Sequence, residues 1–221
     1  MKNATGRPTG HQNASAPPKR QELETKSDLS RKQILDAAAK LFYEQGYAAT
    51  TLRQIAQKAS MKAGSIYYHF GSKDEILDEV LHLGLEAVFS SVRDGLRELS
   101  DSASHRERIE CAITCHLEAL LEHGDYTSAN IRIFGQLPKK LKLKHLRHRN
   151  DYGAFWEQMF LDAQNAGEIR RDIVLQPLRM FVLGALNWTV EWYDPKRFPV
   201  RDLADRVALL IFDGISEHAD N

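Results

Sequence analysis

Apolar residues recur at the three- to four-residue spacing of an amphipathic helix along most of this chain. The repeat is first clear at Ile34, Ala38 and Leu41, and Gly46 is typical of the residue that ends such a helix. No stretch of useful length alternates apolar and polar residues as a strand does. The pattern therefore predicts an all-α fold, with helices over about residues 30–46, 52–59, 62–69, 72–99, 104–123, 125–134, 139–166, 174–193 and 200–218.

Two short helical patterns lie close together in residues 50–73, TTLRQIAQKASMKAGSIYYHFGSK. Thr50 or Thr51 can cap the first helix, and Ser60 lies in the turn before the second. The second pattern is too short and too polar for a core helix, and its small residues allow a partner to come close. Two such helices joined by a tight turn are typical of a helix-turn-helix that enters a DNA groove.

This segment resembles the DNA-binding domain of the TetR family of bacterial transcriptional regulators. Residue type and spacing agree with the family signature over more than twenty consecutive positions. The matching residues are Thr50, Thr51, Ile55, Ala56, Gly64, Ser65, Ile66, Tyr67, His69, Phe70, Ser72, Lys73 and Asp74. The family usually places Gly where this chain has Ser60, and a left-handed backbone there would cost a non-glycine residue about 1 kcal/mol. We therefore expect the turn to be adjusted.

The resemblance implies that the second helix of the pair contacts double-stranded operator DNA. The expected DNA-binding residues are Thr51, Arg53, Lys62, Ala63, Gly64, Ser65, Tyr67, Tyr68, His69 and Lys73. Thr51, Tyr68 and Lys73 are expected to touch phosphates, which position the protein without reading sequence. Lys62, Ala63 and Ser65 lie where base edges can be reached. Gly64 is expected to leave room for the DNA backbone or for the first helix.

Charge is unevenly distributed along the chain, although the formal net charge is zero. Residues 1–73 carry 12 Lys and Arg against 5 Asp and Glu, whereas residues 74–221 carry 18 against 25. A basic head on an acidic body indicates that only the head meets phosphate groups. The alternative is chance asymmetry in a mixed surface.

Three parts are predicted on this basis. Residues 1–29 lack hydrophobic periodicity and form a disordered arm, because such a composition cannot bury enough surface to fold. Its basic residues could touch DNA or make no contact at all. Residues 30–73 form the helix-turn-helix DNA-binding domain, and residues 74–221 form an all-helical ligand-binding and dimerisation domain.

Several other classes of protein are not expected. The chain has no run of about 18 apolar residues that could span a membrane, and its N-terminus has no apolar signal core, so we place the protein in the cytoplasm with no membrane partner. Cys111 and Cys115 lie one helical turn apart, which suits small buried side chains better than a disulfide. Even with His116 and His123 nearby, the spacing is not that of a zinc site, so no metal and no cofactor are predicted.

Catalytic motifs are also missing from the sequence. It contains no G-x-S-x-G, P-loop, Rossmann fingerprint or H-E-x-x-H pattern, so no catalytic residue is assigned and an enzyme is not expected. A purely architectural helical bundle would need neither the basic head nor the Gly-Ser-Ile-Tyr-Tyr-His-Phe helix. A DNA-binding regulator is therefore the leading hypothesis.

The last two predicted helices are rich in apolar residues on several faces. Residues 174–193 are apolar nearly all round, as expected for a buried helix or half of a subunit interface. The resemblance implies that these helices form a four-helix interface in a homodimer. Two heads related by a two-fold axis would then read half-sites about one DNA turn, or a multiple, apart.

The remaining body helices are expected to enclose a pocket for a small hydrophobic effector. The candidate lining residues are Phe89, Ile113, Leu117, Phe134, Arg149, Phe155, Trp156, Phe160 and Trp188. Each of these aromatic and aliphatic residues can equally be plain core. Ligand binding is expected, by analogy with the family, to shift the dimer to a head spacing that mismatches the operator.

A basic segment suggests the class of effector. Residues 138–149, PKKLKLKHLRHR, contain six Lys or Arg and two His. This segment can be a solvated helix start, or it can be an anion-binding rim over an apolar pocket, as an acyl-coenzyme A thioester would need. Residues 148–156 and 187–195 also resemble the TetR subgroup linked to acyl-CoA, fatty-acid and sterol catabolism. A lipid-derived CoA thioester is thus the expected effector, and the alternative is a hydrophobic or aromatic drug-like compound sensed by a repressor of efflux or detoxification.

Overall fold

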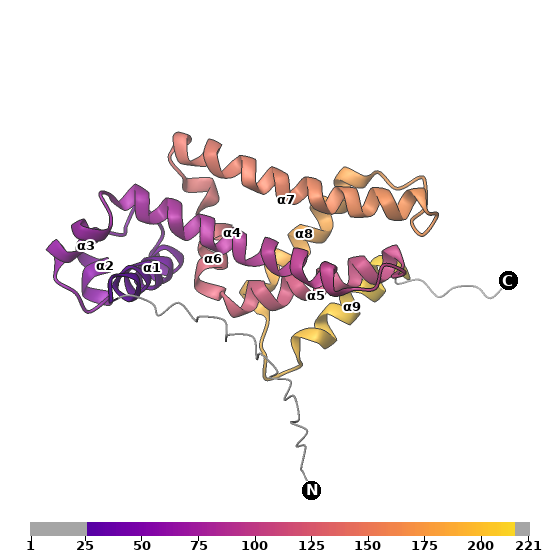
Figure 1. Ribbon diagram of the computed structural model, residues 1–221, viewed down its shortest axis with the longest axis horizontal. Coiled ribbons are helices and arrows are strands. Elements are labelled where there is room, and N and C mark those ends of the chain that lie inside the picture. The colour runs from indigo at the N-terminus through magenta and orange to yellow at the C-terminus, as the bar shows by residue number, and fades with distance from the viewer. Residues whose placement is uncertain (1–25, 215–221) are drawn as a thin grey trace, which may run out of the picture.

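A computed structural model describes residues 26–214, and in that range the chain is built of helices (Figure 1). The elements are α1 (Lys26–Gln45), α2 (Leu52–Lys58), α3 (Ala63–His69), α4 (Lys73–Glu98), α5 (His105–Glu122), α6 (Gly124–Ile133), the short 3-10 helix η1 (Phe134–Gln136), α7 (Lys139–Asn165), α8 (Leu175–Trp192) and α9 (Val200–Phe212). The prediction of an all-α fold with an N-terminal helix-turn-helix is confirmed. Within the described range no helix is both long enough and apolar enough to cross a bilayer.

Two predicted boundaries differ from the structure. Helix α1 begins at Lys26, so the last residues assigned to the arm are helical, and Asp28 in the first turn complements the helix dipole. The rest of that predicted arm, residues 1–25, lies outside the described residues. Helix α9 ends at Phe212, short of the predicted end at residue 218, because Gly214 follows in the left-handed conformation with φ of 70°. Residues 215–218 of that prediction also lie outside the described range.

Side-chain caps fix where α2 and α4 begin. Thr51, not Thr50, caps α2: its Oγ1 accepts from the Gln54 N–H at 3.3 Å, and Gln54 Oε1 accepts from the Thr51 N–H at 2.8 Å. The Oγ of Ser72 accepts from the Glu75 N–H at 3.1 Å and caps α4. The start of the long helix that joins the head to the body is thereby fixed soon after the end of α3.

The helix-turn-helix shares one hydrophobic core with parts of two later helices. Phe42, Ile55 and Ile66 from α1, α2 and α3 are fully buried in this cluster. The first turns of α4 add Leu77 and their neighbours, and α6 adds Ile133. Fully burying one such side chain stabilises the fold by about 2 kcal/mol. Helices α4 and α6 therefore anchor the small head, and the sequence pattern did not reveal the contribution of α6.

A second core holds the body together. It combines the C-terminal half of α4 with α5, α7, α8 and α9, and Trp156 and Phe160 of α7 are fully buried in it. Helix α5 packs against α4 on one side and α9 on another. Because α4 contributes to both cores, it leads from the head into the body as one continuous helix (Figure 1).

The turn between α2 and α3 keeps the left-handed backbone that the family glycine would supply. Ser60 has φ of 57° and is the one non-glycine residue with a positive φ in the described range. Its N–H still donates to the Gln57 carbonyl at 3.1 Å, and the next N–H, that of Met61, donates to the Ala56 carbonyl at 2.8 Å. The expectation of an adjusted turn was wrong, because these two hydrogen bonds require the same turn whichever residue stands there.

Replacing Ser60 with glycine should therefore stabilise the protein. The left-handed conformation costs a non-glycine residue about 1–2 kcal/mol, part of which the greater unfolded-state entropy of glycine offsets. We expect Ser60→Gly to raise the free energy of unfolding by about 0.5–1 kcal/mol in denaturant titrations, and Ser60→Ala to leave it nearly unchanged. An equal effect of both substitutions would contradict backbone strain as the cause.

Candidate nucleic-acid interface and ligand cavity

One face of α3 is exposed and carries most of the predicted DNA-binding residues. Ile66 and Phe70 point into the head core and are buried. Tyr67 and Tyr68 point outward, with 63% and 84% of their surface exposed. The remaining predicted residues that are exposed on this part of the head are Thr51, Arg53, Lys62, Ala63, Gly64 and Ser65. These side chains are thus exposed on α3 and at the start of α2, and their contact with DNA stays a prediction.

Arg31 of α1 holds the C-terminal end of α3 in place. Its Nε donates to Glu79 of α4 at 3.1 Å, and its Nη1 donates to the His69 carbonyl at 2.9 Å. The guanidinium also stacks on the Phe70 ring, 4.2 Å from its centroid. His69 itself is only half-exposed and packs edge-on against the ring of Tyr68, with the ring centroids 5.2 Å apart. Arg31 therefore fixes the C-terminal end of the exposed helix against α1 and α4.

Lys73 is placed differently from the other predicted DNA-binding residues. Its ammonium donates to the carbonyl oxygens of Tyr47 at 2.8 Å and Thr50 at 2.7 Å. It also lies over the Tyr47 ring, 4.1 Å from the centroid. Lys73 therefore ties the start of α4 to the loop between α1 and α2, a structural role that the sequence did not indicate. Its predicted phosphate contact is untested by this geometry.

Gly64 has open space around it. A Cβ built at this position meets no atom within 4 Å, so close packing against the first helix of the pair does not require glycine here. The explanation that Gly64 makes room for the first helix is therefore wrong, and room for DNA stays a prediction.

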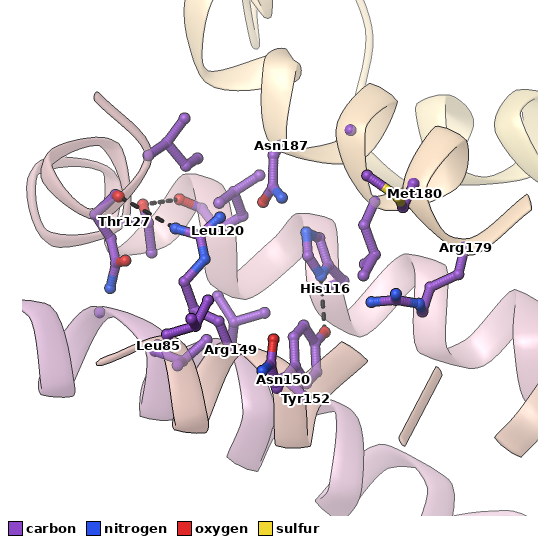
Figure 2. A pocket seen from close by; sticks show the side chains of 17 residues that line it. Leu85, His116, Leu120, Thr127, Arg149, Asn150, Tyr152, Arg179, Met180 and Asn187 are labelled. Carbon is purple, nitrogen blue, oxygen red and sulfur yellow. Dashed lines mark hydrogen bonds between the residues drawn. The ribbon is translucent and has the colours of Figure 1, made fainter. Parts of the chain in front are cut away.

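A cavity of about 300 Å³ lies in the body between α4, α5, α6, α7 and α8 (Figure 2). Its walls combine apolar and polar side chains from all five helices. The lining residues are Gly84, Leu85, Val88, His116, Leu120, Thr127, Asn130, Ile131, Leu146, Arg149, Asn150, Tyr152, Arg179, Met180, Leu183, Gly184 and Asn187. They include two arginines and a histidine but no aspartate or glutamate, so the cavity favours a ligand that carries negative charge.

Arg149 is the arginine without a carboxylate partner in this wall. Its guanidinium stacks on the Phe134 ring at 4.2 Å, and its Nη1 donates to the Asn130 carbonyl at 3.5 Å. No ion pair joins it to an acidic residue in the part of the chain described. Burial lowers the pKa of Arg149, which remains charged at any ordinary pH.

Arg179 reaches the cavity from α8 and lies against α7. Its Nε is 3.0 Å from the Glu157 carboxylate. The guanidinium passes so close to Gly153 that a Cβ at that position would lie 2.2 Å from Nη1. Glycine at position 153 therefore leaves the space in which the Arg179 guanidinium lies.

His116 is a fully buried polar group in the same wall. Its Nδ1 and the Tyr152 hydroxyl form a hydrogen bond of 2.8 Å, while Nε2 has no hydrogen-bond partner. Burial lowers the pKa of His116 to about 4, an effect that the side chain of Asn187 partly opposes. The imidazole is therefore neutral near pH 7.

The nine predicted ligand-binding residues occupy several different places. Arg149 lines the cavity, and Phe89 lines a smaller one of about 220 Å³ between α4 and α7, where Phe155 packs against it. Of the others, Ile113, Leu117, Trp156 and Phe160 are fully buried in the body core, Phe134 lies beneath Arg149, and Trp188 is exposed on α8. The structure does not bring these residues together around one cavity.

Apart from Arg149, the polar residues of the cavity were not identified as ligand-binding residues from the sequence. His116, Asn130, Arg179 and Asn187 lie on three separate helices, and a lone polar residue on an apolar face gives a weak signal. Arg179 offered the clearest signal, because it is the one charged residue in the mostly apolar segment 178–190.

The basic segment 138–149 is only partly at the cavity. The Nζ of Lys144 is 2.5 Å from Asp78 of α4, and that of Lys142 lies over the Phe134 ring. Lys139 and Lys140 are exposed at the start of α7. Arg149 is therefore the basic side chain through which this segment enters the cavity wall.

Helix α6 connects the cavity wall to the head. On one side Asn130 donates from Nδ2 to the Leu81 carbonyl of α4 at 2.6 Å. On another, the Tyr126 hydroxyl donates to Asp36 of α1 at 2.7 Å. Gly84 lets α4 and α6 approach so closely that a Cβ there would lie 2.6 Å from the Tyr126 carbonyl oxygen. A displacement of α6 by a ligand would therefore reach both α1 and α4.

Comparisons with known proteins match both halves of the chain. Residues 34–80 match the bacterial regulatory proteins of the tetR family, and residues 102–215 match the tetracyclin repressor-like C-terminal domain. The HTH-type transcriptional repressor KstR2 from Rhodococcus jostii (strain RHA1) is 29% identical over 192 residues, which cover 84% of this chain and 91% of that protein.

Solved structures share the same architecture. The ketosteroid transcriptional regulator KstR2 of Mycobacterium tuberculosis has a TM-score of 0.75 at 25% identity, covering 85% of this chain and 95% of the other. AibR in complex with isovaleryl coenzyme A and operator DNA has a TM-score of 0.70 at 23% identity, covering 83% of this chain and 98% of the other. The likeness to AibR concerns the fold alone.

Gly64→Ala should separate DNA binding from stability. Alanine is the better helix former and meets no neighbour, so we expect the free energy of unfolding to stay level or to rise by up to about 0.5 kcal/mol. We expect operator affinity, measured by fluorescence anisotropy, to fall at least about tenfold because the methyl group would meet the DNA. Gly124→Ala at the start of α6, where a Cβ also meets nothing, is the matched control. Unchanged affinity of Gly64→Ala would show that this position does not face DNA.

The buried His116 should make stability depend on pH. Its folded-state pKa of about 4 lies below the unfolded value of 6.5, so below pH 6.5 the unfolded chain binds a proton that the folded chain does not. Stability is therefore lost as the pH falls from 6.5 toward 4. In denaturant titrations the wild type should lose about 1.5 kcal/mol between pH 6.5 and pH 5 relative to His116→Leu, in which position 116 does not titrate. If the difference in free energy of unfolding between wild type and His116→Leu does not change with pH, the lowered pKa of His116 is contradicted.

Proposed function

This chain belongs to the TetR family of bacterial transcriptional regulators, and from that premise we propose that it is a repressor that binds a palindromic operator as a homodimer and releases it when a small effector occupies the cavity. The family consists of transcriptional regulators and not of enzymes. The observation that carries the effector-dependent part of the proposal is the cavity of about 300 Å³ next to α6 and α4, the two helices that lead to the head.

Operator binding is assigned to the exposed face of α3. The two tyrosines, Lys62 and the small residues at the start of the helix supply hydrogen-bond donors without large apolar side chains. Residues 1–73 of the chain also hold its excess of positive charge. Both properties support contact with phosphate groups and base edges by this face.

Dimerisation is assigned to α8 and α9. These helices expose large apolar side chains that a monomer would leave in water: Phe181 is 79% exposed, Trp188 62% and Leu209 55%. A second copy packed against this face through a two-fold axis would bury them and place two α3 helices for one palindrome.

The proposed effector class is an acyl-CoA thioester. The cavity wall carries Arg149 and Arg179 and no acidic residue, which supports an anionic ligand with an apolar part over a neutral drug-like compound. The AibR complex gives one protein of this fold that holds isovaleryl coenzyme A. For this chain, the support comes from its own cavity.

Release is proposed to pass through α6. A ligand that displaces Asn130 or Thr127 in the cavity wall would move a helix that is hydrogen-bonded to α4 through Leu81 and to α1 through Asp36. Only a ligand that binds the released form better than the DNA-bound form can shift this equilibrium.

Release of DNA by thioesters tests the proposal. An operator is first selected by binding from a random duplex library, and two half-sites in inverted repeat are expected. Medium-chain acyl-CoA thioesters should then release the protein at concentrations at least about tenfold lower than the matching free acids or CoA alone, because both the acyl group and the CoA moiety contribute to binding. Equal potency of acid and thioester would refute the CoA class, and release by neutral aromatic compounds alone would favour the detoxification alternative.

A further inference from the structure

The cavity is more polar than a plain hydrocarbon chain requires. Eight of its lining residues have polar side chains, and they come from four different helices. A buried polar group without a hydrogen-bond partner costs free energy, and a saturated acyl chain offers no partner. The wall is therefore suited to a ligand that brings oxygen atoms into the cavity.

A second, separate observation is that His116 has a buried ring nitrogen without a hydrogen-bond partner. Its side chain is fully buried, it lines the cavity, and its Nε2 has no hydrogen bond in the structure. The opposite ring nitrogen is occupied by the Tyr152 hydroxyl at 2.8 Å, which fixes the orientation of the ring. An oxygen atom of a ligand is the natural partner for the free nitrogen.

Two guanidinium groups flank this histidine. Figure 2 shows Arg149 and Arg179 entering the cavity region on either side of His116. Arg149 has no acidic partner in the described part of the chain, and no carboxylate lines the cavity. Of the two arginines, Arg179 is the one whose charge is paired. Its Nε lies 3.0 Å from the carboxylate of Glu157, which does not line the cavity. The net charge of the wall is therefore positive.

We infer that the effector carries a carboxylate at the buried end of its acyl group, held by Arg149 and Arg179 with His116 Nε2 as a further hydrogen-bond partner. The inference rests on the proposed function and narrows its effector from acyl-CoA thioesters in general to those of dicarboxylic acids. A carboxylate accepts two parallel hydrogen bonds from a guanidinium, which gives it an advantage over a ketone or a hydroxyl group. Gly153 is the positioning residue, because its lack of a Cβ allows Arg179 to lie there.

Calorimetry of the purified protein tests this without any need for an operator. Hexanoyl-CoA and adipoyl-CoA have acyl groups of equal chain length and differ in the terminal carboxylate, and CoA alone is the blank. We expect adipoyl-CoA to bind at least about tenfold more tightly than hexanoyl-CoA. Equal affinity, or tighter binding of hexanoyl-CoA, would overturn the inference and leave the proposed function intact. Binding of neither thioester would overturn both.

Matched variants show where the carboxylate lies. Arg149→Met should remove most of the preference for adipoyl-CoA, whereas Arg147→Met, which removes the same charge from an exposed site two residues away, should retain it. If Arg149→Met weakens both thioesters by the same factor, Arg149 meets the CoA moiety and the buried carboxylate is wrong.

Gly153→Ala tests the positioning role separately. The new methyl group would lie 2.2 Å from Arg179 Nη1 and force the guanidinium to move, so adipoyl-CoA affinity should fall several-fold while hexanoyl-CoA affinity changes little. The thermal midpoint of unfolding, measured alongside, shows whether the variant folds normally. Retained adipoyl-CoA affinity in a normally folded variant would remove Arg179 from the site.

Discussion

Burial of α4 in two separate cores is the constraint on which the rest of the structure depends. Ile76, Leu77 and Leu81 of its N-terminal part are fully buried with the helix-turn-helix, and Val92 further along is fully buried with the body. A helix packed at both ends cannot bend freely, so a shift at the body end is carried to the head as a rigid movement. The hydrogen bonds of Lys73 also tie the start of the same helix to the loop between α1 and α2.

The cavity adds an electrostatic constraint to this packing. The neutral imidazole of His116 avoids the cost of a buried charge, and the Arg149 guanidinium lies against the Phe134 ring. Under the proposed function, an anionic effector would interact with these side chains and favour the arrangement of α6 and α4 that it binds best. Recognition and response would then depend on the same side chains.

The sequence predicted the local features of the fold well and the cavity poorly, for a physical reason. The helical segments and the threonine cap of α2 depend on neighbours within a few residues. The cavity depends on residues such as His116 and Arg179 that meet only after five helices have packed. Hydrophobicity alone cannot distinguish Trp156, which fills the core, from Leu183, which lines the cavity. The structural role of Lys73 could not be predicted either, because it depends on where the folded chain places the carbonyl groups of Tyr47 and Thr50.

The participation of α6 in the head core has a consequence for the construction of chimaeric regulators. Ala129, Ile133 and Leu137 complete a core whose other members come from residues 34–81. A transplanted head cut at residue 73 would lose the α4 side of that core and would meet a foreign α6. Exchange of DNA specificity between family members is therefore better achieved by grafting the exposed residues of α3, or by moving the head together with α4 as far as Leu81 and the matching face of α6. The unit that can be exchanged is a surface, and it does not coincide with a continuous stretch of chain.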